Sequence, residues 1–312
     1  MTAFILRRLW QMVPTLLGVI LLVFLLFNLV GGDPAYLLAG KMSNKEQIEN
    51  IRTQLGINQP YYVQLWIFIK QVLTADFGAS WSTNEAVSHI ITSRIGPSLT
   101  VLVPMLLLET FFSVLLALAV AYVRGSLTDR AIMIICTIAM SISLLVYIIV
   151  GQYVLAYKLG WFPVQGWGES FSQNLLHYSA LPILLGVAVG IAPNTRLYRT
   201  FFLDEINQDY VRTARAKGLS ENRVMLKHVL RNALIPIITN LMIYLPGLLI
   251  GHFLIERFFS IPGIGREVIL AVERSDFPVI KAVTIYVAIA TMVVNLLADL
   301  LYRAVDPRVQ LK

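Results

Sequence analysis

The chain has 312 residues, of which 57% are apolar and only 14% are charged, and its mean hydropathy is +0.72. This composition excludes an ordinary soluble domain and predicts a membrane protein. The net charge of +7 is not that of a nucleic-acid-binding protein, because the basic residues cluster in short segments between apolar runs. We therefore expect membrane lipid, and no nucleic acid, as a partner. The single cysteine, Cys136, excludes an intrachain disulfide.

The first apolar run extends from about residue 10 to 30 and follows two basic residues, Arg7 and Arg8. Signal peptides share this charge pattern. The run is longer than the apolar part of a signal peptide, and no small-residue cleavage site follows it. We expect it to remain in the protein as the first transmembrane helix.

A helix needs about 20 apolar residues to cross a bilayer, and six runs of the chain meet this length. They lie at about 10–30, 98–122, 132–156, 177–195, 233–255 and 281–302. The sequence therefore predicts an all-α polytopic protein with six transmembrane helices. Prolines interrupt the fourth and fifth runs and predict kinks there: Pro182, Pro193, Pro236 and Pro246.

The connections between these runs differ in charge. Lys and Arg are more numerous in the segments on the same side as the two termini than in those on the opposite side. Because basic residues are retained in the cytoplasm, this asymmetry predicts that both termini are cytoplasmic. The predicted organisation is a first helix within 1–30, an external segment at 31–96, and a five-helix core at 97–312 that contains a long cytoplasmic connection at 196–231.

The external segment 31–96 has the pattern of folded structure. Ser43 and Glu46 have the spacing of a capping box, and Gly56 stands where a helix would end. A second amphipathic stretch from Tyr61 to Leu73 is too short to span the bilayer. We expect it to lie on the outer membrane surface, with its aromatic residues as interfacial anchors rather than as a ligand cage.

The sequence contains no motif of an ATPase or an enzyme. It has no glycine-rich phosphate loop that ends in Gly-Lys-Ser or Gly-Lys-Thr, no nucleophile elbow, and no histidines at metal-ligand spacing. The pair Gly263 and Gly265 lacks the third glycine of a dinucleotide site and is interpreted as a turn. We therefore expect no catalytic residue, no metal and no cofactor bound by this chain.

Two acidic residues fall inside predicted spans, and buried charge in lipid suggests a function. Asp299 lies four residues from Arg303 and from Asn295, so local pairing on one helix face explains it. Glu109 has no partner nearby in the sequence. It either lines a transport pathway or pairs with another subunit.

The most informative segment is the long connection from Arg196 to Arg231. Residues 208–217 have a helical composition, and Gly218 ends the pattern. Val211, Ala214 and Gly218 mark a face with little bulk, which is suited to docking in a groove of a partner protein. The alternative is a solvated basic loop near anionic lipid.

Within this segment the sequence resembles the inner-membrane permeases of ABC importers for dipeptides, oligopeptides and nickel. Their cytoplasmic EAA loop has Glu-Ala-Ala, three further residues and a glycine. Here Arg212-Thr213-Ala214 and Gly218 have that spacing, and the wider DYVRTARAKGLS stretch is similar to the peptide-permease version. The later Ile-x-Leu-Pro of the general motif is absent, as is usual in the peptide branch.

Further matches follow in family order along nearly the whole chain. They are Gly32-Asp33-Pro34, LGINQPYYVQ from Leu55, Asp76-Phe77-Gly78, FSIPGIGREV from Phe259, RSDFPVIKA from Arg274, and Asp306-Pro307-Arg308. Each is weak alone, but their order and spacing together are specific.

The resemblance implies a permease subunit in the bacterial cytoplasmic membrane that pairs with a second, similar permease. Two ATP-binding subunits would hold ATP and Mg, and a periplasmic binding protein would deliver peptides or similar small solutes. The ATPase-coupling residues would be Asp209, Tyr210, Arg212, Thr213, Ala214, Arg215, Lys217 and Gly218. Pathway or gating residues would be Glu109, Pro182, Pro193, Pro236 and Pro246.

Two other functions fit the composition less well. A secondary transporter driven by an ion gradient would also be basic inside and free of ATP motifs, but such folds show internal repeats with paired broken helices, and we find no convincing repeat. An intramembrane enzyme would need a polar catalytic pair, which Glu109 and Asp299 do not form. The substrate stays open among dipeptides, oligopeptides, glutathione-like peptides, peptide antibiotics, nickel chelates and sugars.

Overall fold

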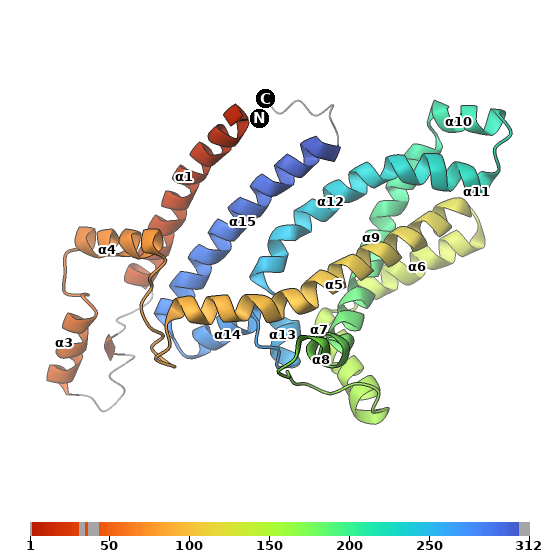
Figure 1. Ribbon diagram of the computed structural model, residues 1–312. Helices are drawn as coiled ribbons and strands as arrows, with labels where there is room; N and C mark the ends of the chain where they lie inside the picture. The colour runs from red at the N-terminus through yellow and green to blue at the C-terminus, as the bar shows by residue number, and fades with distance from the viewer. Residues whose placement is uncertain (1, 31–34, 37–43, 306–312) are drawn as a thin grey trace.

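The computed structural model describes residues 2–30, 35–36 and 44–305, and this part of the chain is almost entirely helical (Figure 1). The polytopic all-α class is confirmed. Five helical segments are long and apolar enough to cross a membrane: Ile5–Asn28, Val87–Tyr122, Ala180–Ile206, Glu221–Phe258 and Phe277–Leu300. They correspond to α1 (Thr2–Leu25) with η1 (Leu26–Val30), α5 (Val87–Tyr122), α9 (Ala180–Ile206), α11 (Glu221–Val224) to α13 (Phe253–Phe258), and α15 (Phe277–Val305).

The third predicted span is not one straight helix. It consists of α6 (Leu127–Ser141), α7 (Leu144–Gly151) and η2 (Gln152–Lys158), and the two halves meet at an angle of 89°. Ile142 and Ser143 adopt extended backbone conformations between them. Serine favours this conformation before a helix, and hydropathy does not register the break because the flanking residues are apolar. The expectation of a single helix over 132–156 was therefore wrong.

The centre of the helical core is α9. It lies along α5, and α6, α7 and α12 (Leu230–Ile250) also pack against it. In the most apolar stretch of α9, 50% of the residues are buried within the chain. In the most apolar stretch of the first span, only 17% are buried. The fourth span therefore faces other helices, and the first is available to lipid or to another subunit.

Two short helices precede α5 and lie to one side of the core (Figure 1). The first, α3 (Lys45–Gln54), begins after Asn44, whose backbone N–H donates to Gln47 Oε1. The predicted capping box at Ser43 and Glu46 was therefore one residue too early, and Ser43 itself lies outside the described residues. The predicted end of this helix at Gly56 is confirmed by its φ of +67°.

The second short helix, α4 (Tyr61–Thr74), is apolar on two sides. Phe68 and Val72 are buried against α1 and α15. On the opposite side Tyr62, Trp66 and Leu73 are exposed. The expected amphipathic segment is present, and its exposed side carries aromatic rings.

The remaining helices lie at the two ends of the spans. At one end are α10 (Asp209–Ala216), α11 and η4 (Met225–Val229), together with the start of α1 and the end of α15 (Figure 1). The other end holds α8 (Phe171–Gln173), η3 (Asn174–Tyr178), α13 and α14 (Ile264–Glu273), as well as α3 and α4. The helix α5 runs without interruption past residue 96, where the external segment was expected to end.

Candidate functional site: the coupling segment and its supports

The helix α10 is a two-turn unit with defined ends. Gln208 precedes it in extended conformation, and Asp209 lies in its first turn, where a negative charge favours the helix dipole. At its other end Gly218 has a φ of +78°. The N–H of Gly218 donates to the carbonyl of Arg215 at 2.9 Å, and that of Leu219 to Ala214 at 3.4 Å. This is the Schellman arrangement, which requires a left-handed residue and so favours glycine.

Two small side chains fasten α10 to the rest of the chain. Val211 is fully buried and Ala214 is 4% exposed. They pack in a cluster with Tyr198 and Phe202 of α9 and with Val224 of α11. The expectation that the face with little bulk docks on a partner was therefore wrong: Val211 and Ala214 hold the helix to its own core. Gly218 belongs to the helix end, because no atom lies within 4 Å of the place where its Cβ would be.

The opposite face of α10 is polar and exposed. The side chains of Asp209 and Arg212 are 95% and 71% exposed and form a weak pair with an N–O distance of 3.3 Å. Thr213 and Lys217 are exposed as well. These four predicted coupling residues lie together on the side that faces away from the core.

The two other predicted coupling residues form contacts at the edges of α10. The hydroxyl of Tyr210 donates to Glu205, and burial together with this acceptor raises the pKa of Tyr210 to about 12, so it stays protonated at neutral pH. Arg215 donates from Nε and Nη2 to the two carboxylate oxygens of Glu221 at 3.0 and 2.6 Å. These hydrogen bonds raise the pKa of Arg215 further. Both contacts fix the direction in which α10 projects.

An ion pair supports the end of α9 that leads to α10. Arg199 donates from Nε and Nη2 to Asp129 of α6 at 2.9 and 2.7 Å. Asp129 is only 4% exposed. It also accepts a hydrogen bond from the backbone N–H of Gly125. Bidentate Arg–carboxylate pairs of this kind have high directional specificity. Sequence reasoning missed the pair, because its members lie 70 residues apart.

The intramembrane acid Glu109 has a partner within the chain. Asn194 of α9 donates from Nδ2 to Glu109 Oε1 at 2.5 Å. Gly190 lies one turn earlier on α9, and a Cβ there would overlap the Glu109 carboxyl group. The contact therefore joins α5 to α9. The sequence showed no local partner because Asn194 is distant in the chain.

The second intramembrane acid has a partner that the sequence did not suggest. Asp299 of α15 accepts from Arg8 Nη2 of α1 at 2.8 Å. The side chain of Arg303, the expected partner, lies outside the described residues. Asp299 thus links α15, the last span, to α1, the first span.

The four predicted gating prolines lie in two helices. Pro182 is buried in the first turn of α9, and Pro193 lies exposed within the same helix. Pro236 and Pro246 lie half-buried within α12. Both helices continue through these residues, and a gating role stays a prediction.

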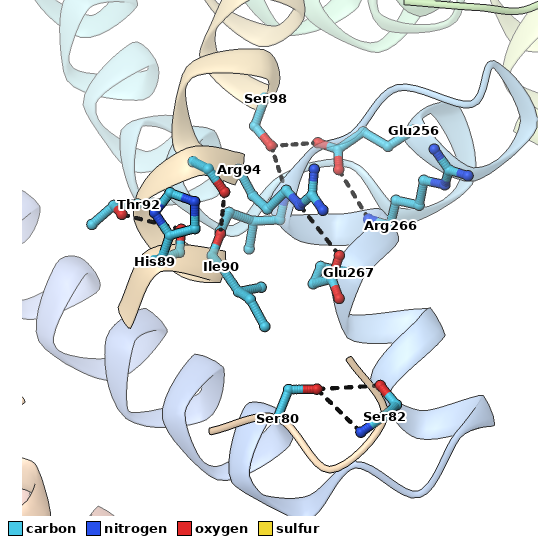
Figure 2. A network of polar contacts seen from close by, with 12 residues as sticks. Ser80, Ser82, His89, Ile90, Thr92, Arg94, Ser98, Glu256, Arg266 and Glu267 are labelled. Carbon is cyan, nitrogen blue, oxygen red and sulfur yellow. Dashed lines mark hydrogen bonds and ion pairs between the residues drawn. The ribbon is translucent and has the colours of Figure 1, made fainter. Parts of the chain in front are cut away.

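The end of the molecule opposite α10 contains a buried carboxylate that sequence reasoning missed. Glu256 of α13 has no exposed surface. Its carboxylate accepts from the Ser98 hydroxyl of α5 at 2.8 Å and from the backbone N–H of Arg266 at 3.0 Å (Figure 2). It also accepts from the backbone N–H of His252 at 3.1 Å. The Ser98 oxygen in turn accepts from the N–H of Ile264 at 2.9 Å. This set, the Glu256 clamp, joins α5 to α13 and α14.

The glycines near this carboxylate are explained by close approach. A Cβ on Gly265 would lie 2.8 Å from the N atom of Phe253, and one on Gly263 would overlap the Glu256 carboxylate. The Pro-Gly-Ile-Gly stretch is therefore more than a turn, because it allows the backbone to surround the carboxylate. An acid six residues before a Pro-Gly-x-Gly sequence is the signal that could have predicted it.

A second carboxylate fastens the loop before α5 to the start of α15. Asp276 is 1% exposed. It accepts from the hydroxyls of Ser80 and Ser82 at 2.5 and 2.9 Å, and from the backbone N–H of Trp81 at 3.2 Å. Two sequence matches, around Asp276 and before α5, thus meet in space. The matches at 32–34 and 306–308 lie outside the described residues.

Comparison with known proteins identifies the family of the chain. Residues 110–311 match the family described as binding-protein-dependent transport system inner membrane component, and residues 1–102 match the N-terminal family of the same transport-system membrane components. The chain is 36% identical over 312 residues, covering all of both chains, to the glutathione transport system permease protein GsiC of Salmonella choleraesuis (strain SC-B67). The GsiC protein of Escherichia coli (strain K12) is similar to the same extent, 36% over 312 residues. The chain belongs to the family of inner-membrane components of binding-protein-dependent transport systems, and it is a multi-pass permease subunit of an ATP-driven ABC importer.

Proposed function

We propose that α10 is the coupling helix of this permease and that its exposed face docks on an ATP-binding subunit. The observation that carries the proposal is the division of α10 into two faces. Val211 and Ala214 anchor it in its own core. Asp209, Arg212, Thr213 and Lys217 project outward without a buried partner. A helix held this firmly transmits displacement, and a charged outer face gives specificity of docking.

The proposed assembly contains this chain, a second similar permease, two ATP-binding subunits and a periplasmic binding protein. ATP and Mg would be bound and ATP hydrolysed on the ATP-binding subunits. The basic residues that surround α10 and the start of α1 support a cytoplasmic location of both termini. The opposite end, with α3, α4, α13 and α14, then faces the binding protein.

The proposed substrates are short peptides of the size of glutathione. The two relatives at 36% identity are glutathione transport system permease proteins. The binding protein would determine the choice among peptides, so this chain need only provide a path that tolerates them. Glu109 and the four prolines are proposed to lie beside this path.

In the transport cycle, movement of the ATP-binding subunits would displace α10 and the helices fixed to it. Val211 and Ala214 contact α9, and Asp129 binds α9 through Arg199. A push on α10 would therefore move α9 and α6 together. Such rigid-body motion is a common way to alternate between two open states.

A charge reversal on the outer face tests the proposal. We expect Arg212→Glu to reduce recovery of the ATP-binding subunits with the tagged permease from detergent-solubilised membranes by at least tenfold, about 1.4 kcal/mol of binding free energy. The reason is that Arg212 is exposed on the docking face. Lys227→Glu is the matched control, because it makes the same change on an exposed residue of η4, outside α10.

Equal recovery of the ATP-binding subunits with both variants would contradict docking through α10. Loss with both variants, at unchanged permease yield, would show that the basic segment as a whole, rather than this helix, forms the interface.

A further inference from the structure

A cavity separate from the coupling segment lies between α1, α4, α15 and the loop before α5. Its volume is about 820 Å³. Its walls include Phe24 of α1, Phe27 of η1, Ile67 and Phe68 of α4, and Phe277 of α15, and its polar lining residues are Asn28, Gln64 and Gln71. We call this cavity the Lys281 pocket, because Lys281 is its charged lining residue.

The cation in this pocket lies beside two aromatic rings. Lys281 Nζ lies 5.4 and 5.7 Å from the ring centroids of Phe27 and Phe68. No Asp or Glu is among the described residues that line the pocket. An ammonium group in apolar surroundings is costly unless it is paired, and contacts with ring faces offset only part of that cost. Within the part of the chain that the structure describes, an anion bound from outside would supply the missing negative charge.

The depth of Lys281 identifies the kind of anion. Lys281 is the fifth residue of α15, so at a rise of 1.5 Å per residue it lies only about 6 Å from the start of that helix. The neighbouring α4 exposes Tyr62 and Trp66. Exposed Tyr and Trp rings are enriched at the level of the lipid headgroups. Both features favour a position of the ammonium group near the level of the phospholipid headgroups.

The placement of the pocket favours a lipid over a transported solute. The first span, which forms one wall, is only 17% buried in its most apolar stretch. The helices that carry the Glu109–Asn194 contact, α5 and α9, do not line the pocket. Its lining combines a cation and amides with aromatic and aliphatic side chains, which suits a molecule with a phosphate and acyl chains.

From this geometry we propose that the Lys281 pocket is a binding site for a phospholipid, with the lipid phosphate at Lys281 and the amide of Gln71 near the headgroup. The lipid would fill the space between the external helices and the first and last spans. It would thereby complete the outer surface of the permease at the external side of the bilayer.

Native mass spectrometry of the assembled importer in mild detergent tests the site, with phosphatidylglycerol added as the probe. We expect Lys281→Gln to weaken lipid retention roughly fivefold, since one basic residue near a lipid surface contributes about 1 kcal/mol. Lys281→Arg keeps the charge and should stay within about twofold of the wild type. Lys70→Gln is the matched control, because Lys70 is exposed on α4 and does not line the pocket.

Two results would overturn the proposal. One is equal retention of phosphatidylglycerol by the wild type and Lys281→Gln. The other is displacement of the lipid by glutathione or a dipeptide, which would assign the pocket to a solute carboxylate. If Lys281→Gln fails to assemble, the wild type is titrated with phosphatidylglycerol and with diacylglycerol, which lacks the phosphate, and equal retention of the two overturns the site.

Discussion

Three buried carboxylates in this permease, Asp129, Glu256 and Asp276, each have donors in a distant part of the chain. A buried charge of this kind is stable only while its donors are in place. Each carboxylate therefore fixes two segments relative to each other. The energetic cost of removing such a partner is the basis of the first prediction.

We expect Asp129→Asn to lower the stability of the permease by about 3 kcal/mol, because the bidentate contact with Arg199 is lost and the guanidinium keeps no carboxylate partner there. The midpoint of thermal unfolding in detergent measures this. The matched control is Asp209→Asn, which removes an exposed pair with Arg212 and should change stability by less than about 1 kcal/mol. Equal midpoints for the two variants would show that the Asp129 pair is not structural.

At the scale of single residues, the sequence located α10 but did not determine its buried face. The spacing of Val211 and Ala214 marks one side of a helix whether that side meets a partner or the chain's own core. Only the positions of Tyr198, Phe202 and Val224 decide between the two. The same limit applied to Glu109, since Asn194 is 85 residues away.

The end of α10 is the element whose geometry depends most on one residue. Gly218 has a left-handed backbone and open space around it. Any L-residue except Asn or Asp therefore pays a backbone penalty without a steric clash inside the chain.

We expect Gly218→Ala to cost about 1 kcal/mol at this helix end and to lower substrate-stimulated ATP hydrolysis by the reconstituted importer several-fold. Gly218→Asn should retain most of the activity, because asparagine tolerates the left-handed conformation. If Gly218→Asn is inactive while Gly218→Ala is active, side-chain bulk rather than backbone conformation is decisive, and Gly218 touches a partner.

Among the elements, the long apolar runs predicted the spans well because hydropathy follows directly from composition. The break at Ile142–Ser143 was not predictable in this way, since two extended residues hardly change the mean hydropathy of the run. Helix starts in polar sequence were also less certain: α5 begins at Val87, earlier than its apolar run.

At the scale of the whole molecule, the Glu256 clamp and Asp276 hold the end opposite α10 together, and α10 is held at the other end by α9 and its neighbours. The two ends thus form separate supports for the same spans. The sequence matches around Phe259 and Arg274 indicated family-specific segments but did not predict that these segments surround carboxylates. The side-chain donors to these carboxylates come from distant parts of the chain, namely α5 and the loop before it.

We expect Glu256→Ala to destabilise the permease by about 3 to 5 kcal/mol, because the Ser98 hydroxyl and the two backbone N–H groups lose their acceptor and a cavity remains. Protein yield and thermal unfolding in detergent measure this. Glu273→Ala is the matched control: its pair with Arg257 at 3.1 Å is exposed, so the cost should stay within about 1 kcal/mol. A similar loss in both variants would argue against a special role of the clamp.

The Glu256 clamp also has a consequence for membrane insertion. Ser98 and Glu256 are separated by 158 positions. During synthesis, Ser98 and the start of α5 therefore lack this partner until residue 256 has been translated. Long-range closure of this kind comes late in folding. A nascent chain that stalls before residue 256 would leave this end of α5 unfinished. We expect cellular proteases to recognise an incomplete permease at this end before it joins any other subunit.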